Sequence, residues 1–198
     1  MRFVLGLTRT LVALSFGLWI GGLLFFGAIT AAIMFPKTRA AGVPQLAPEM
    51  VGPMLSRFAI VCTVCSVFLV LGWLIDGALT KRTLWWRAQG VLSLVAVTLG
   101  AYLNFALLPA VERDQSAVLP LYVRSLNPQN VLTPQEAELK SRFDAGHQSF
   151  NKLAGINIWL LVAALACLMA RTLPEPLSQR EAKSDADAEA ERFIGASA

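Results

Sequence analysis

Charged residues are scarce in this chain, and their scarcity decides the class of protein. Only 15% of the 198 residues are Asp, Glu, Lys or Arg, whereas 56% are hydrophobic; a soluble domain usually carries about 25% charged residues. No charged residue occurs in the stretches 10–36, 58–75, 88–111 and 153–170. A helix needs about 20 apolar residues to cross a bilayer, so the composition excludes an ordinary soluble domain and indicates an integral membrane protein.

Histidine and cysteine are also rare. A single histidine, His147, excludes haem ligation by two histidines of one chain. Three cysteines without a second Cys-x-x-Cys motif give no disulfide framework. Cys62 and Cys65 fall within a predicted span, where burial disfavours the thiolate that binds metals, so we expect them to serve packing. The basic residues behind the net charge of +4 flank the spans, so nucleic acid is not an expected partner.

The uncharged stretches also narrow the activity. Proton-coupled transport normally keeps Asp, Glu or His inside the spans, and these four stretches contain none of them. Asp76 follows the second stretch without a second aspartate nearby, and no serine lies in a nucleophile-elbow context. We therefore expect neither an enzymatic activity nor a bound cofactor.

The same stretches predict an all-α, integral membrane four-helix bundle, because backbone amides in lipid must be hydrogen-bonded within a helix or a closed barrel. We expect a four-helix transmembrane domain over residues 1–172. Its spans are predicted at about 10–36, 56–76, 86–109 and 150–172. The first apolar run exceeds the ~7–15 residues of a signal-peptide core, so the first helix is expected to stay uncleaved. The acidic, Ala-rich segment 173–198 is typical of a disordered cytoplasmic tail.

The connections between the spans carry different signals. The first, 37–57, contains three prolines and is expected to be irregular. Residues 117–126 in the third connection are apolar enough to lie at the membrane interface. The sequence TPQE at 133–136 forms a capping box that predicts a helix start. This amphipathic helix, 134–152, is predicted to continue into span four, giving a long fourth helix that extends outside the membrane.

A narrow apolar seam follows one side of this amphipathic helix at alternating spacings of four and three. Its members are Leu139, Phe143, Gly146, Phe150 and Leu153. A seam of this kind needs a partner, and we expect the first connection to pack against it. His147 lies beside the seam, one turn after Phe143 and one turn before Asn151.

The basic residues of the short connections predict the orientation. They are Arg2, Arg9, Lys81, Arg82 and Arg87. An excess of Lys and Arg in short loops marks the cytoplasmic side, so we expect both termini to be cytoplasmic in a bacterial inner membrane. Trp73, Trp85 and Trp86 would then form an aromatic belt at the inner interface.

Two groups of residues are candidates for a site. Asn104, His147 and Asn151 are expected at the outer side, as a polar cluster that fixes the third and fourth helices. Small residues form a smooth face on the first helix, and they are Ala13, Gly17, Gly21 and Gly22. We expect this face to serve packing inside the bundle, with contact between two copies as the alternative.

Copper is the alternative for His147. Imidazole and thioether together suit Cu(I), and Met34, Met50 and Met54 share the predicted outer side with His147. We expect a structural role for the histidine and no resident metal. These four residues remain the candidate ligands if the protein handles copper.

Several short motifs resemble those of a known family. The stretches LWIGGLLFFGAITAAIMFP (18–36), NFALLP (104–109) and FDAGHQSFN (143–151) are similar to the bacterial four-helix domain of unknown function related to transmembrane protein 205 of animals. The resemblance rests on Trp19, Gly21, Gly22, Asn104, Pro109, Phe143, His147 and Asn151. It covers residues 10–172 and implies a membrane protein without an assigned reaction, whose animal members are associated with tolerance to metal drugs.

Together these observations favour a non-catalytic accessory, packing or scaffold subunit of the inner membrane. Its expected partners are the lipid bilayer and either other membrane subunits or a second copy of the chain. The alternative is a membrane protein involved in copper handling or tolerance.

Overall fold

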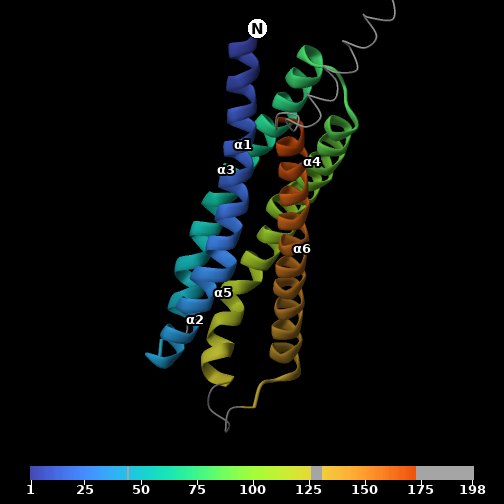
Figure 1. Ribbon diagram of the computed structural model, residues 1–198. Helices are drawn as coiled ribbons and strands as arrows, with labels where there is room; N and C mark the ends of the chain where they lie inside the picture. The colour runs from blue at the N-terminus through green and yellow to red at the C-terminus, as the bar shows by residue number, and fades with distance from the viewer. Residues whose placement is uncertain (44, 126–130, 173–198) are drawn as a thin grey trace, which may run out of the picture.

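The computed structural model describes residues 1–43, 45–125 and 131–172, which form four long helical rods (Figure 1). The first rod contains α1 (Arg2–Leu24), the π-helical η1 (Phe25–Thr30) and α2 (Ala31–Ala40); the second is α3 (Leu46–Leu79); the third contains α4 (Leu84–Tyr102), the π-helical η2 (Leu103–Leu107) and α5 (Leu108–Ser125); the fourth is α6 (Pro134–Thr172). Each rod is long and apolar enough to cross a membrane. The predicted all-α four-helix bundle is confirmed, and the protein is a multi-pass membrane protein.

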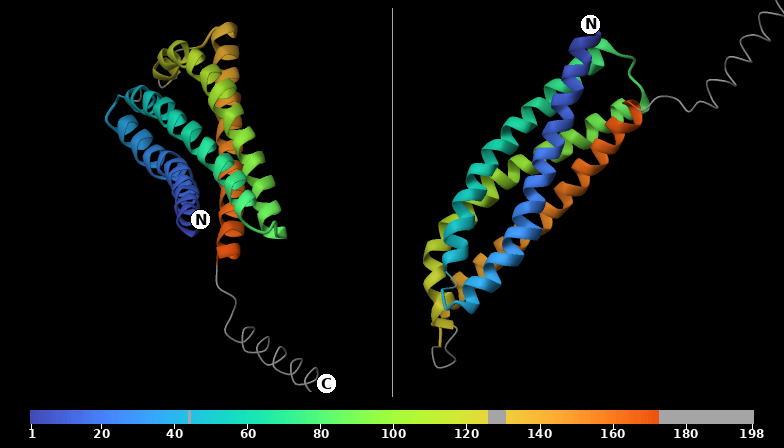
Figure 2. Two further views of the ribbon diagram at one scale, coloured as in Figure 1. Left: turned by 90° about the horizontal axis from the view of Figure 1, so that it is seen from above. Right: turned by 60° about the vertical axis from the view of Figure 1, so that its left-hand side comes forward.

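The rods associate as two pairs. The first rod packs against the second and the third against the fourth, and contacts of α1 with α6 and of α3 with α4 join the pairs. We call the end with Met1, the turn 80–83 and Thr172 the basal end, and the end with residues 41–43 and 131–133 the distal end. The pairs cross closely in the basal half and diverge toward the distal end (Figure 2).

Two tryptophans lock α3 to α4 near the basal end. The rings of Trp73 and Trp86 stack with centroids 4.8 Å apart, and each indole N–H donates to the other residue's backbone carbonyl, at 3.1 and 3.2 Å. The rings lie over glycines: a Cβ on Gly90 would collide with Trp73, and a Cβ on Gly77 would collide with Trp86. Each ring therefore fills a notch that only glycine leaves open.

The core of the crossing region is built the same way. Phe16, Trp19, Leu69 and Leu161 are fully or almost fully buried there. Trp19 occupies the space that a side chain at Gly100 would need. Large rings on one rod thus meet glycines on another, which lets the backbones approach closely.

The first connection differs from its prediction. Residues 37–57 were expected to be irregular, but α2 continues to Ala40 and α3 begins at Leu46. Pro48 stands in the first turn of α3, where the backbone N–H that proline lacks would have no helical partner. Pro53 lies farther inside α3. The prolines therefore mark a helix start, and the irregular segment is much shorter than predicted.

The third connection differs as well. Residues 117–126 were expected to lie along the membrane interface, but up to Ser125 they continue the third rod as part of α5. Val118 and Leu121 are buried, and α5 packs along α6. The apolar seam of α6 is covered by α5 and not by the first connection, as the edge contact of Tyr122 with Phe143 shows.

The start and the length of the fourth helix were predicted correctly. The hydroxyl of Thr133 accepts from the Glu136 backbone N–H at 3.3 Å, and the Glu136 carboxylate accepts from the Thr133 backbone N–H at 2.8 Å. These bonds form the capping box, and the latter lowers the pKa of Glu136. The predicted tail, 173–198, lies outside the described residues.

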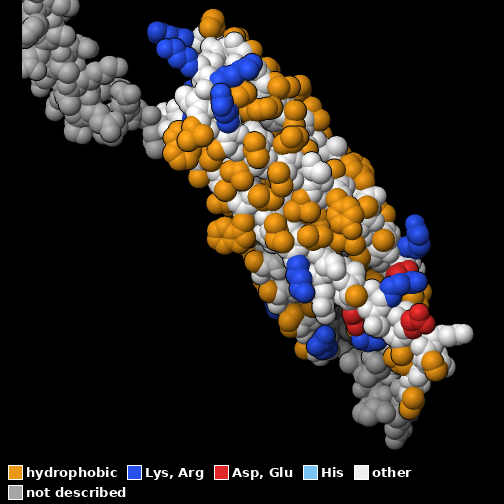
Figure 3. Space-filling model, turned by 90° about the vertical axis from the view of Figure 1, so that its right-hand side faces the viewer, with side chains coloured by type: hydrophobic (Ala, Val, Ile, Leu, Met, Phe, Trp, Pro, Cys, Tyr) orange, Lys and Arg blue, Asp and Glu red, His pale blue; other side chains and the backbone are white. Residues whose placement is uncertain are grey.

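The surface matches a membrane span of limited thickness. Figure 3 shows an apolar band across one face, with Lys and Arg toward both ends and Asp and Glu toward one end.

The predicted aromatic belt is corrected, because Trp73 and Trp86 stack between helices and only Trp85 of the three is exposed. Rods of up to 39 residues extend about 58 Å at 1.5 Å per residue. That length exceeds the hydrocarbon core of about 30 Å.

The tryptophan notch predicts the effect of one methyl group. We expect Gly90→Ala to lower the free energy of unfolding by about 1–3 kcal/mol, because Trp73 is fixed by stacking and cannot yield. Gly21→Ala is the control, since no atom lies within 4 Å of its added Cβ. Thermal unfolding in detergent checks both variants, and equal melting temperatures would contradict the notch.

Candidate functional site

A buried carboxylate at the basal end joins the first, second and fourth rods. Asp76 of α3 is only 3% exposed. The guanidinium of Arg9 lies against its Oδ1, with Nε at 3.1 Å and a terminal nitrogen at 3.0 Å. The guanidinium of Arg171, at the end of α6, pairs with its Oδ2. The two arginines therefore hold opposite oxygens of one carboxylate.

Arg171 extends this network to the third rod. Its other terminal nitrogen donates to Oε1 of Gln89 on α4 at 2.9 Å. The side chain of Arg171 is 5% exposed, and Gln89 is 2% exposed. We call Arg9, Asp76, Gln89 and Arg171 the basal network. It contains one side chain from each rod and carries one positive charge more than negative charge.

The chemistry of the basal network is that of a clasp. Guanidiniums engage both oxygens of the Asp76 carboxylate, so neither oxygen is free to act as a base. Removing one partner from a buried ion pair is costly because the other charge stays desolvated. The network therefore fixes the rods relative to one another at this level.

The sequence contains a signal for the basal network that the sequence analysis did not use, since it interpreted Arg9 only as a marker of orientation. Arg9, Asp76 and Arg171 are the first charged residues beyond three of the uncharged stretches. Asp76 is also the only acidic residue between Glu49 and Glu112. A lone carboxylate beside arginines at one membrane surface is a candidate for pairing.

A second polar contact lies deeper in the bundle. Asn157 of α6 is completely buried, and its amide donates to the backbone carbonyl of Ala96 on α4 at 3.2 Å. It lies beside Gly100, which also receives Trp19. Asn157 thus links the third and fourth rods, the role that we expected of Asn104, His147 and Asn151.

The three residues of the predicted polar cluster do not share contacts. The amide of Asn104, in η2, donates to the backbone carbonyl of Ala59 on α3 at 3.5 Å. His147 and Asn151 are exposed on α6. The His147 ring stacks on Phe143 with centroids 6.1 Å apart. Among the described residues no hydrogen bond joins the three.

The small residues of α1 lie in two different environments. Gly22 faces Phe58 of α3 so closely that a Cβ would collide with the ring, and Ala13 packs against the core. Gly17 and Gly21 point outward, with no atom within 4 Å of the position that a Cβ would take. Internal packing therefore applies to Ala13 and Gly22, and the other two glycines lie on the exposed face of the bundle.

The candidate copper ligands are distributed over different elements. Met50 and Met54 are exposed on α3, and Met34 lies in α2. His147 lies on α6, which packs mainly against α4 and α5. In the described part of the chain no group of three His, Cys, Asp or Glu side chains could hold a metal ion. Cys62 and Cys65 are free thiols in the apolar core.

A comparison with protein families identifies the family of this chain. The family described as "Domain of unknown function (DUF4149)" matches residues 14–117, more than half of the sequence. The chain belongs to this family. The match includes Asp76 and Gln89 of the basal network, whereas Arg9, Arg171 and the motif at 143–151 lie outside it. The comparison with curated proteins gave no match, and neither did the comparison with solved structures.

The basal network predicts a large cost for one isosteric change. We expect Asp76→Asn to lower the free energy of unfolding by about 3–5 kcal/mol, because the buried guanidinium of Arg171 and the partly buried guanidinium of Arg9 lose their counter-charge. Equilibrium unfolding in mixed SDS micelles measures the loss. Adding Arg171→Gln to Asp76→Asn is expected to cost less than the sum of the single changes.

The matched control for this prediction is Asp114→Asn. Asp114 pairs with Arg142 through two hydrogen bonds of 3.0 and 3.1 Å, but the Arg142 side chain is 68% exposed. Exposed pairs contribute at most about 1 kcal/mol. A loss for Asp76→Asn no greater than that for the control would contradict the role of the basal network.

Proposed function

We propose that this DUF4149 protein, a membrane protein of unknown activity, is a non-catalytic accessory subunit that packs against a transmembrane helix of another protein. The first rod supports the proposal. Only 6% of its most apolar stretch is buried within the chain, against 22%, 28% and 33% for the second, third and fourth rods. The first rod is therefore the least covered by its own bundle.

The exposed side of α1 suits a helix partner. Gly17 and Gly21 lie one turn apart on it with open space beside them, next to the exposed side chains of Leu14 and Leu18. Helices associate in lipid through close backbone packing, which small residues at a spacing of four allow. A partner helix would bury this side of α1 in the way that the rods bury one another inside the bundle.

The proposal includes an orientation and a location. Both termini are cytoplasmic in a bacterial inner membrane, which the basic residues of the short connections support. The relation to transmembrane protein 205 of animals is part of the same proposal and rests on the motif residues. No nucleic acid, substrate or cofactor is included. Copper handling is not proposed, because no described contact brings a methionine to His147.

Site-specific photocrosslinking in intact membranes tests the accessory role. A photoreactive amino acid at Leu18 is expected to give one adduct of defined mass with a second membrane protein. The same group at Trp159, which is 74% exposed on α6, is the matched control and is expected to give none. Equal labelling from both positions, or only uncrosslinked chain, would disprove the proposal; an adduct between two tagged copies would replace it with a homo-oligomer.

Substitution of the two glycines gives an independent prediction. Gly17→Leu/Gly21→Leu is expected to reduce the adduct at least tenfold while leaving the melting temperature of the purified chain unchanged, because a Cβ at either position meets no atom within 4 Å. Gly155→Leu on α6 is the control, since its added Cβ also meets no atom within 4 Å. Retention of the adduct in the double variant would remove α1 as the docking helix.

A further inference from the structure

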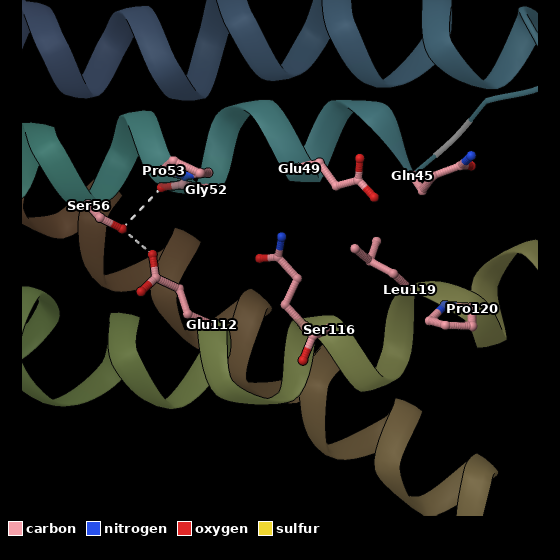
Figure 4. Close-up of a pocket in the computed structure, with 10 residues that line it drawn as sticks. Gln45, Glu49, Gly52, Pro53, Ser56, Glu112, Ser116, Leu119 and Pro120 are labelled. Atoms are coloured by element: carbon pink, nitrogen blue, oxygen red, sulfur yellow. Dashed lines mark hydrogen bonds between the residues drawn. The ribbon is translucent and has the colours of Figure 1, made fainter.

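The divergence of the two helix pairs opens a cavity near the distal end, between α3 and α5. Its volume is about 660 Å³, which falls within the range of about 300–1,000 Å³ of pockets for small organic ligands. Figure 4 shows Glu49 of α3 and Leu119 of α5 directed toward the space between the two helices. The cavity is therefore far larger than a bare ion requires.

Two π-helical segments lie on the basal side of the cavity. At 1.5 Å per residue, Phe25 lies about 24 Å from the level of Arg9, and Leu103 about 21 Å from that of Gln89. Pro109 explains the second segment, because its ring would clash with the carbonyl of Phe105, four residues earlier and inside η2. On the distal side of this level the two helix pairs diverge (Figure 2).

The cavity lies about one hydrocarbon-core thickness away from the basal network. Ser56, in its wall, is about 30 Å along α3 from Asp76 at 1.5 Å per residue, and the hydrocarbon core is about 30 Å thick. If the basal network lies at one surface of the membrane, the cavity begins at the other. At that level the side chains of the cavity meet water as well as lipid.

The charge of the wall has one sign. Glu49 and Glu112 are acidic, and none of the described residues that line the cavity is Lys, Arg or His. The Glu112 carboxylate accepts a hydrogen bond from Ser56, whereas the Glu49 carboxylate has no hydrogen bond or ion pair in the described part of the chain. Gln115 donates to the carbonyl of Pro48 at 3.0 Å and thereby tethers the two walls.

The rest of the wall is apolar or neutral. Pro53, Leu119 and Pro120 supply hydrocarbon surface, and Gly52 leaves the wall flat opposite Gln115. An occupant must therefore combine an apolar body with a positive charge. An anion would be repelled by the two glutamates, and an uncharged apolar molecule would leave the Glu49 carboxylate without a partner.

We propose that this cavity binds an amphipathic organic cation, with its charged group beside Glu49 and Glu112 and its apolar body against Leu119 and the prolines. The site uses none of the residues of the basal network or of the exposed face of α1. It is therefore independent of the accessory role.

Tetraphenylphosphonium is a suitable probe, because it combines one positive charge with a large apolar body. Equilibrium dialysis of the detergent-purified full chain is expected to show saturable binding. Glu49→Gln is expected to weaken binding at least tenfold and Glu49→Lys to abolish it. Glu49 is exposed, so neither change removes a packing contact, and an unchanged melting temperature confirms that the variants are folded.

Glu138→Gln is the matched control, because Glu138 is an exposed carboxylate on α6 that does not line the cavity. It makes the same change in net charge and is expected to leave binding within twofold of the unmodified chain. Absence of saturable binding would overturn the proposal, and so would equal weakening by Glu138→Gln and Glu49→Gln. Competition by tetraphenylborate as strong as by unlabelled probe would overturn it as well, since apolar contact alone would then be responsible.

Discussion

The carboxylate of Asp76 sets the level at which the four rods meet. Arg9 approaches one of its oxygens from the first rod and Arg171 the other from the fourth, and Arg171 also reaches Gln89 on the third. A charge removed from water must keep its partners. Sliding any rod by one helical turn, about 5.4 Å, would separate them, so the network fixes the axial register of the whole bundle.

The rods are held differently on the two sides of the π-helical level. Toward the basal end, tryptophans fill glycine notches and leave the backbones close together. Toward the distal end, ion pairs and an apolar seam hold α5 to α6, and polar contacts such as that of Gln115 with Pro48 cross between the pairs. A cavity can therefore persist at the distal end, whereas the crossing region is closed.

Much of the fold could be predicted from local sequence patterns, whereas the site residues were harder to predict. Uncharged runs identify the spans because lipid excludes charge, and the bonds of the TPQE capping box connect residues only three apart. The partner of the α6 seam depends on which rod lies beside it, which no local pattern shows. Gly21 and Gly22 differ by about 100° around the helix, and this rotation alone places one outside the bundle and the other against Phe58. Arg9 and Arg171 resemble ordinary flanking charges, and only the packing of distant segments shows that both reach Asp76.

The position of Asp76 along the chain bears on how the protein is made. Ribosomes deliver the first rod to the membrane before the second, so Arg9 is already present when Asp76 arrives. The α3–α4 hairpin then closes through the paired indoles of Trp73 and Trp86, which belong to neighbouring segments of the chain. Arg171, near the end of the fourth rod, is the final member of the network to arrive, so the network is completed when the fourth rod is made.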